Sequence, residues 1–240
     1  MNIVLSLQKK LQKSFMKEII NFLNLIVENN NRPWFQQHKD LYINAQGKFN
    51  AIAEQILIGV QKFDPLTRGL TLKDCTYRFY RDTRFSPDKS PYKRHFGLFI
   101  CPNGKKSGLA GYYFHVEGEG AEYLGHHGLY PGMYMCEPFI TRSVREDIST
   151  KGDEFVKALK KAKNFNMDFS SKLKKVPKDY PADHPYAEYL KLKDFCLYEN
   201  ISDDMIYSDH LVEWVVEEFR SCYDFNSFLN RAALFVMENK

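Results

Sequence analysis

Residues 95–117 read HFGLFICPNGKKSGLAGYYFHVE, and this segment contains two strand patterns joined by a turn signal. Phe96, Leu98 and Ile100 alternate with other residues, so they are expected on one face of a strand. An Asn-Gly pair then gives a strong hairpin-turn signal, and a second strand is expected from Leu109 to Glu117. Short strands that follow one another through turns favour an antiparallel sheet, because a parallel pair needs a long crossover.

Helical and strand patterns lie on both sides of this segment. Further strands are expected over about residues 75–80, 122–130 and 194–200. Apolar spacing predicts helices over about residues 9–28, 33–63, 137–149, 153–163, 208–222 and 225–239. No internal repeat or linker divides the chain. The predicted fold is therefore one α+β domain over residues 1–240, in which a curved antiparallel sheet is flanked by N-terminal and C-terminal helices.

Composition limits the classes of protein to consider. Apolar residues make up 44% of the chain and charged residues 27%, as in ordinary globular domains. No apolar run approaches the roughly 20 residues that a membrane span needs. The five cysteines include no C-x-x-C pair, and the histidines match no metal-ligand spacing, so neither a disulfide framework nor a metal site is expected. We expect a cytoplasmic protein with no membrane contact.

The basic charge of the chain is concentrated in residues 78–95, RFYRDTRFSPDKSPYKRH. This segment holds six Lys or Arg residues and two Asp, a local net charge of +4, which equals the net charge of the whole chain. If a strand continues to Arg84, then Arg78, Tyr80, Asp82 and Arg84 share one of its faces. Arginines placed around carboxylates and aromatic rings must either pair internally or meet an anion from outside.

The same segment carries a family resemblance. Its pattern is R-x-x-R-D-x-R-F-x-x-D-K-x-x-Y-K, from Arg78 to Lys93. It resembles a bacterial family of conserved hypothetical proteins, the domain of unknown function 2461. Other segments resemble that family as well: NNRPWF at 30–35, GYYFHVE at 111–117, GLYP at 128–131, VPK at 176–178 and KDF at 193–195. The resemblance spans about residues 15–236 and implies no activity. The sequence departs from the family pattern at Pro33, where Glu is expected, and at His126 and His127, where glycines are expected. It departs also at Pro131, which follows Tyr130 directly.

The favoured hypothesis is a site for a small anionic ligand, phosphorylated or carboxylated, at the 78–93 motif. A short helical turn is expected at residues 86–89, whose free N–H groups would favour an anion. No cofactor can be named. Asp82 and Asp88 are the candidates for a general acid or base. His115 and Glu117 share a strand face and are expected to form an acid–base pair beside the motif. The predicted ligand-binding residues are Arg78, Tyr80, Arg81, Arg84, Lys89, Tyr92, Lys93 and His115.

Two other hypotheses remain open. In the first, the motif is an internal ion network of a scaffold or interaction protein that has no catalytic role. If all three arginines at 78, 81 and 84 were paired internally with no cavity beside them, the ligand hypothesis would fail. In the second, the basic and aromatic residues bind nucleic acid, although an isoelectric point of about 8.6 lies below the strongly basic range of such domains. The sequence gives no oligomeric state.

Overall fold

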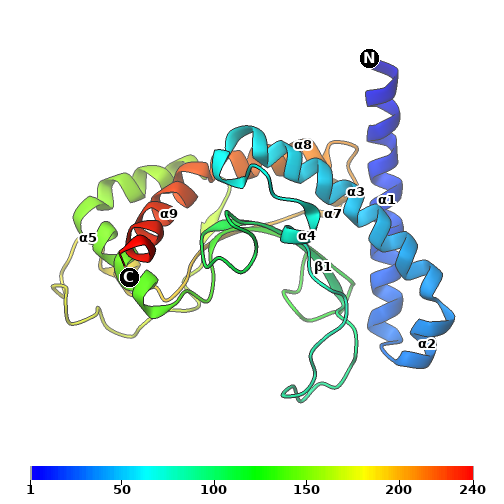
Figure 1. Ribbon diagram of the computed structural model, residues 1–240, viewed down its shortest axis with the longest axis horizontal. Coiled ribbons are helices and arrows are strands. Elements are labelled where there is room, and N and C mark those ends of the chain that lie inside the picture. Colours follow the sequence, from blue (N-terminus) through cyan, green and yellow to red (C-terminus); the bar gives the residue numbers. More distant parts are fainter. Residues whose placement is uncertain (1, 240) are drawn as a thin grey trace.

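A curved antiparallel sheet forms the centre of the fold (Figure 1). The computed structural model describes the backbone of residues 2–239 and the side chains of residues 12–239. Within that part of the chain, five strands pair in the order β1-β2-β3-β5-β4. The strands are β1 (His95–Ile100), β2 (Gly111–Glu117), β3 (Gly128–Met133), β4 (Asn166–Met167) and β5 (Phe195–Asn200). The α+β class and the antiparallel pairing predicted from the sequence are confirmed.

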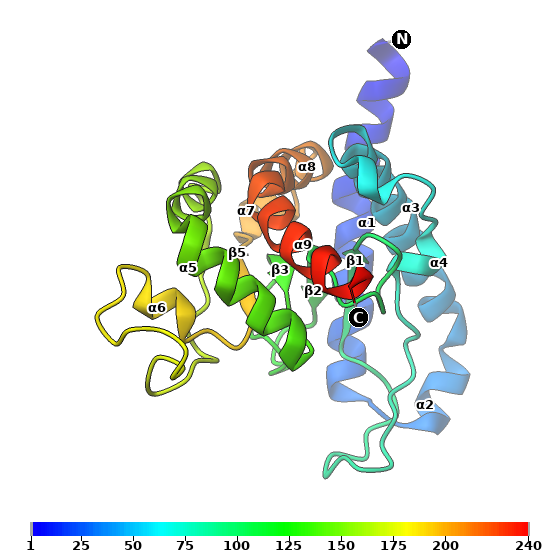
Figure 2. The same ribbon diagram turned by 60° about the vertical axis from the view of Figure 1, so that its left-hand side comes forward.

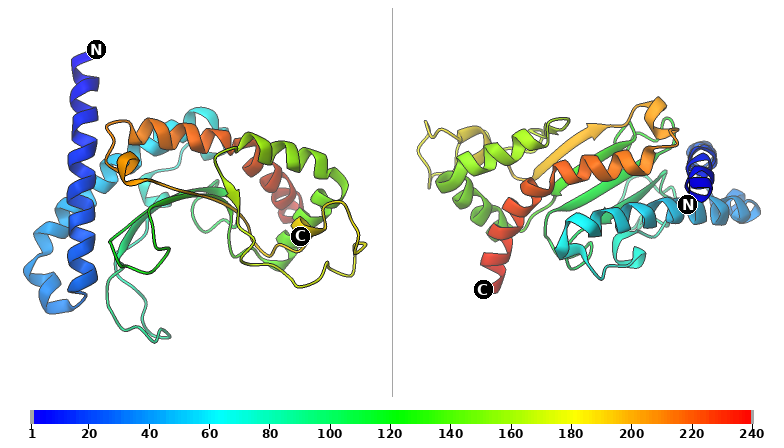
Figure 3. Two further views of the ribbon diagram at one scale, coloured as in Figure 1. Left: turned by 180° about the vertical axis from the view of Figure 1, so that it is seen from behind. Right: turned by 90° about the horizontal axis from the view of Figure 1, so that it is seen from above.

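The helices precede, interrupt and follow the sheet. In chain order they are α1 (Asn2–Glu28), α2 (Arg32–Gln37), α3 (Lys39–Phe63), the 3-10 helix η1 (Pro65–Thr67), α4 (Leu72–Cys75), α5 (Pro138–Lys161), α6 (Ala187–Leu190), α7 (Asp203–Ile206), α8 (Leu211–Ser221) and α9 (Tyr223–Glu238). Figures 2 and 3 show α3, α8 and α9 lying on one face of the sheet, with α1 standing at the β1 end. No helix of the described residues covers the opposite face, which we call the helix-free face.

Two apolar clusters hold the helices against the sheet. The larger lies beneath α1, α3 and α8, and it includes the β1–β2 pairs Leu98–Phe114 and Phe96–Val116, which are opposite each other in register. The smaller packs α5 and α9 against the Phe195 end of β5. Because side chains alternate along a strand, the residues between these core positions point to the helix-free face. No helix in residues 2–239 is both long enough and apolar enough to cross a membrane.

Several predicted boundaries are corrected by the structure. The helix expected over 33–63 is divided at His38, whose ring Nδ1 forms a hydrogen bond with the Trp34 carbonyl. The two helices expected over 137–163 form one element, α5, with a kink at Lys151. The strand expected over 122–130 begins only at Gly128, because Glu122 and Gly125 have φ angles of 56° and 85°, in the left-handed region outside the range of extended strands.

The predicted strand over 75–80 is also wrong. Its first residue ends α4, and the rest is extended chain with single bridges, Thr76 to Leu98 and Tyr80 to Tyr92. Because the two bridges go to different partners, no continuous ladder forms. The helical turn expected at 86–89 is absent, since these residues lie in an irregular loop. The Asn103-Gly104 turn does form, with φ angles of 62° and 84°, but it lies near the start of a ten-residue connection, 101–110, between β1 and β2.

Candidate functional site

The motif forms a narrow arm that projects from the sheet (Figure 1). Two backbone hydrogen bonds join its two sides: Arg81 N donates to Pro91 O at 2.9 Å, and Lys93 N donates to Phe79 O at 2.9 Å. Between them, residues 82–90 form an irregular loop, which we call the motif loop. Arg78, Tyr80, Asp82 and Arg84 therefore do not share a strand face, and each has surroundings of its own.

Arg81 holds the motif loop together from inside. Its Nη1 donates to Asp88 Oδ2 at 2.6 Å and to the Ser90 carbonyl at 3.0 Å, and its Nη2 donates to Ser86 Oγ at 3.3 Å. The Ser90 hydroxyl and N–H, together with Arg81, hold the pKa of Asp88 well below its usual range. Asp88 is thus ionised, and both of its carboxylate oxygens already accept hydrogen bonds from within the loop. Both residues act here as structural parts of the loop.

Arg84 and Asp82 form a separate pair at the exposed end of the loop. Arg84 Nε and Nη2 donate to the two oxygens of Asp82 at 3.0 and 2.7 Å, and this pairing lowers the pKa of Asp82 to about 2. The Arg84 side chain is 77% exposed. Lys89 Nζ donates to the Thr83 carbonyl at 3.0 Å across the same loop. The two candidate acids, Asp82 and Asp88, are both ionised and both bound to arginine.

We therefore expect alanine substitutions of Arg81 and Arg84 to lower the free energy of unfolding by different amounts. Arg81→Ala removes several hydrogen bonds from a side chain that is 25% exposed, so we expect the free energy of unfolding to fall by about 1–2 kcal/mol. Arg84→Ala should leave it within experimental error, because exposed ion pairs contribute little. Urea unfolding of both variants checks the difference. Equal effects of the two substitutions would show that Arg81 does not hold the loop.

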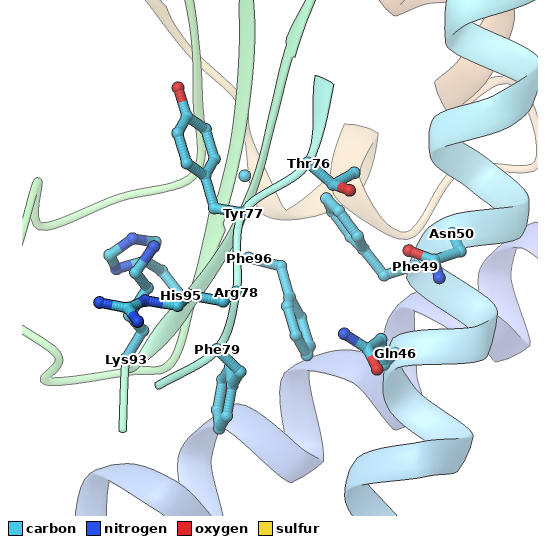
Figure 4. Close-up of a pocket in the computed structure, with 11 residues that line it drawn as sticks. Gln46, Phe49, Asn50, Thr76, Tyr77, Arg78, Phe79, Lys93, His95 and Phe96 are labelled. Carbon is cyan, nitrogen blue, oxygen red and sulfur yellow. The ribbon is translucent and has the colours of Figure 1, made fainter. Parts of the chain in front are cut away.

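Arg78 and Lys93 differ from the other cations of the motif. Among the described residues, neither side chain has a hydrogen bond or a salt bridge, although Lys93 Nζ lies 4.9 Å from the centre of the Tyr77 ring. Burial and the neighbouring Arg78 charge lower the pKa of Lys93. Figure 4 shows both side chains with His95 on one side of the 76–79 segment, away from α3. They border a cavity of about 20 Å³, which holds roughly one water.

The tyrosines of the motif lie in different environments. Tyr80 is 46% exposed, whereas Tyr92 is 1% exposed and stacks on Phe35 with 4.0 Å between ring centroids. Asn30 binds the Tyr92 backbone at two points: its Nδ2 donates to Tyr92 O at 2.9 Å, and its Oδ1 accepts from Tyr92 N at 3.0 Å. The 30–35 segment and the motif thus form one packed unit, in which Tyr92 belongs to the core and cannot reach a ligand.

A chain of buried hydrogen bonds runs along β2 on the helix-free face. His115 Nε2 lies 3.0 Å from Glu117 Oε2, and His115 Nδ1 lies 3.0 Å from Tyr113 Oη. His115 is 0% exposed and Glu117 3%. The two side chains that strand alternation placed together therefore form a hydrogen bond. Sequence analysis missed Tyr113, although the same alternation places it two residues before His115 on that face.

The protonation states follow from these contacts. Burial lowers the pKa of His115, against the influence of Glu117. Burial raises the pKa of Glu117, but the hydrogen bonds from His115 and the Leu124 N–H outweigh it, so this pKa lies below its usual value. A carboxylate only accepts, so Nε2 of a neutral His115 donates to Glu117, and Nδ1 accepts from the Tyr113 hydroxyl. Burial, above all, raises the pKa of Tyr113 well above its usual value.

Glycines lie on both sides of this chain, and one of them makes room for it. Gly97 and Gly128 lie opposite His115 on the two neighbouring strands. A Cβ atom on Gly97 would lie 2.5 Å from Tyr113 Oη, so the tyrosine occupies space that a side chain would take. Gly97 also lines the cavity beside Arg78 and Lys93. The Tyr113 side chain therefore packs against a backbone position that also borders the cavity.

His95 completes the surroundings of this site. Its ring lies 4.9 Å from His115 and stacks on Tyr123 at 4.3 Å, as measured between ring centroids. Burial, followed by the nearby His115 and Lys93, lowers the pKa of His95 to about 3, so it is neutral at physiological pH. Within the described part of the chain, no group of three or more His, Cys, Asp or Glu side chains is arranged to hold a metal ion.

Comparison with known proteins agrees with the resemblance seen in the sequence. A family model described as "Conserved hypothetical protein (DUF2461)" matches residues 18–228. The chain belongs to this family. Comparison of this chain with the curated proteins and with the solved structures found no match. The DUF2461 match includes the whole motif arm, the 30–35 segment that holds it and the Tyr113–His115–Glu117 chain, so all parts of the candidate site lie inside the family's span.

Proposed function

We propose that this protein binds a small anionic ligand at Arg78 and Lys93, beside the edge strand β1. One observation carries the proposal: these two cations lie next to each other without a carboxylate partner among the described residues. Their mutual repulsion is relieved when an anion binds between them. The other two arginines of the motif are occupied, Arg81 by Asp88 and Arg84 by Asp82, so they lie outside the proposed site.

The dimensions of the site favour a phosphate or carboxylate group on a larger molecule. The cavity of about 20 Å³ takes little more than one oxygen atom of the anionic group. The rest of the ligand then lies outside it, over the Tyr77 ring, which is 40% exposed. Tyrosine rings stack on sugars and bases, and the planar guanidinium of Arg78 suits a forked contact with two anion oxygens.

We further propose that the Tyr113 hydroxyl, which packs against Gly97 at the border of the cavity, contacts the same ligand. Because it donates to His115 Nδ1, its oxygen lone pairs remain to accept a hydrogen bond. A ligand hydroxyl placed there could pass its proton through Tyr113 to His115, whose resulting positive charge Glu117 would stabilise. This arrangement provides a proton acceptor beside an anion site, which is the combination that general-base chemistry uses.

The interaction hypothesis has one observation in its favour. Phe85, at the exposed end of the motif loop, is 94% exposed, which is unusual for a large apolar side chain on a loop held together by Arg81. A loop of this kind could insert Phe85 into an apolar pocket of a partner protein. If that were the role of the motif, Phe85→Ala would abolish the interaction, whereas Arg78→Gln would leave it intact.

Ligand binding is tested by thermal shift and calorimetry at low ionic strength, with inorganic phosphate, sugar phosphates, nucleotides and small carboxylates as probes. We expect at least one probe to stabilise the wild type, because a ligand that binds the native state raises its apparent stability. Arg78→Gln and Lys93→Gln should each weaken binding by roughly tenfold, as expected for a charge-assisted hydrogen bond.

Arg84→Gln is the matched control, since it removes the same charge from the same motif but outside the proposed site. It should leave the affinity unchanged. If no probe stabilises the wild type, or if Arg84→Gln weakens binding as much as Arg78→Gln, the proposal is wrong. Binding of short DNA or RNA with a steep dependence on salt would instead support the nucleic-acid hypothesis.

A further inference from the structure

A second and larger cavity lies at the other end of the molecule, beside the first turns of α5. It has a volume of about 370 Å³, which falls within the range of small-molecule sites. Its walls come from three segments that are distant in sequence: the start of α5, residues 173–180 and Lys193 just before β5. Figure 2 shows the loop that contains 173–180, in yellow, next to α5. We call it the α5 cavity.

The α5 cavity carries an excess of positive charge. Arg142, Arg145 and Lys193 line it, against a single carboxylate, Asp179. Arg142 and Arg145 are three residues apart on α5, so they lie on the same face of the helix. None of the three cations forms a salt bridge with any residue in the described part of the chain. The local net charge of the lining is therefore +2.

Arg145 is the cation held most firmly in place. Its Nη2 donates to the Leu192 carbonyl at 2.6 Å, which fixes the guanidinium against the chain that leads to β5. Its Nε is buried and has no hydrogen-bond partner among the described residues. Burial lowers the pKa of Arg145, as expected for a partly desolvated charge without a counter-ion.

Two acidic side chains of α5 that lie nearby have partners other than the three cations. Glu146 accepts a hydrogen bond from Tyr180 Oη at 3.3 Å. Asp147 pairs with Lys151 at 3.0 Å and with Arg231 at 3.3 Å. Glu146 therefore lies beside Tyr180 of the cavity wall, and neither carboxylate forms a salt bridge with Arg142, Arg145 or Lys193 among the described residues.

We propose that the α5 cavity is a binding site for a small organic dianion, a dicarboxylate or a phosphate ester, distinct from the site at Arg78 and Lys93. Two arginines on one helix face offer forked contacts to carboxylate or phosphate oxygens, and Lys193 supplies a third positive charge. Leu173 and Pro177 form an apolar wall that suits a compact carbon skeleton. A lining charge of +2 favours a dianion over a monoanion.

Calorimetry on the full chain at low ionic strength tests this proposal, with succinate, inorganic phosphate and butyrate as probes. We expect succinate or phosphate to bind and butyrate, a monoanion, to bind more weakly. Binding of succinate alone identifies a dicarboxylate site, and binding of phosphate identifies a phosphate-ester site. Arg142→Gln and Lys193→Gln change exposed side chains, so both variants should fold, and each should weaken binding by roughly tenfold.

Two control variants test whether the dianion binds inside the α5 cavity. Lys157→Gln makes the same chemical change as Lys193→Gln at an exposed position farther along α5, and it should leave binding unchanged. Arg78→Gln should also leave it unchanged, so failure of one anion site does not imply failure of the other. The proposal is overturned if neither dianion binds the wild type, or if Lys157→Gln weakens binding as much as Lys193→Gln.

Discussion

We expect Asn30→Ala to lower the free energy of unfolding by about 3 kcal/mol. The substitution removes two hydrogen bonds, of 2.9 and 3.0 Å, from the Tyr92 backbone. Tyr92 is 1% exposed, so its N–H and carbonyl groups would be left buried without partners. Each such group costs about 1–3 kcal/mol. Urea denaturation followed by circular dichroism measures the difference between the variant and the wild type.

Asn29→Ala provides the control for this prediction. The two asparagines are adjacent, but the Asn29 side chain donates only to the Leu25 carbonyl, at 3.0 Å within its own helix end. Its replacement should cost well under half of the Asn30 effect. Tyr92 lies next to Lys93, so Asn30→Ala should also weaken binding of any anion at Arg78 and Lys93, even under conditions where the variant is fully folded. Equal costs for the two alanine variants would contradict the role given to Asn30.

The elements predicted correctly are those determined by the pattern of residues close together in the sequence. Strands β1 and β5 follow from alternation, and the kink in α5 lies between the two helices that were expected there. The motif arm was mispredicted because its extended chain pairs with two different partners. Single bridges of this kind depend on where β1 and Tyr92 lie in space, which spacing along the chain does not reveal.

The candidate site was predictable to a similar extent. Alternation along β2 was enough to place His115 beside Glu117, and it contained the signal for Tyr113 as well. It was not possible to tell which arginine pairs with which aspartate. Arg81 reaches Asp88 across seven residues, and Arg84 reaches back to Asp82 across two, so the pairing depends on the loop conformation. The α5 cavity was missed because its walls come together only in the folded chain.

Glu199 on β5 is expected to make the stability of this protein fall as the pH rises. Burial, above all, raises its pKa from 4.5 to about 7, with the neighbouring Glu218 adding to the effect. Glu199 Oε2 is buried and has no donor to bind among the described residues. When Glu199 is protonated it can share its proton with Glu218, and when it is ionised the two negative charges repel each other.

The direction of the pH effect follows from the raised pKa. Because the folded state holds this proton more tightly than the unfolded chain does, the contribution of Glu199 to stability is fully present below pH 4.5 and is lost as the pH rises through about 7. The full shift is equivalent to about 3 kcal/mol, and partial solvent exposure of the side chain reduces the expected loss to roughly 2 kcal/mol between pH 5 and pH 8.

Glu199→Gln isolates this contribution, because the amide has nearly the same shape, cannot ionise and can donate to Glu218. The variant should match the wild type closely at pH 5 and exceed it by roughly 2 kcal/mol in free energy of unfolding at pH 8. Glu217→Gln, on the same helix as Glu218 but with its side chain 66% exposed, should show no such increase with pH. The variant could instead exceed the wild type in free energy of unfolding by the same amount at pH 5 and pH 8. That result would reflect the new hydrogen bond alone, and it would show that ionisation of Glu199 does not destabilise the fold.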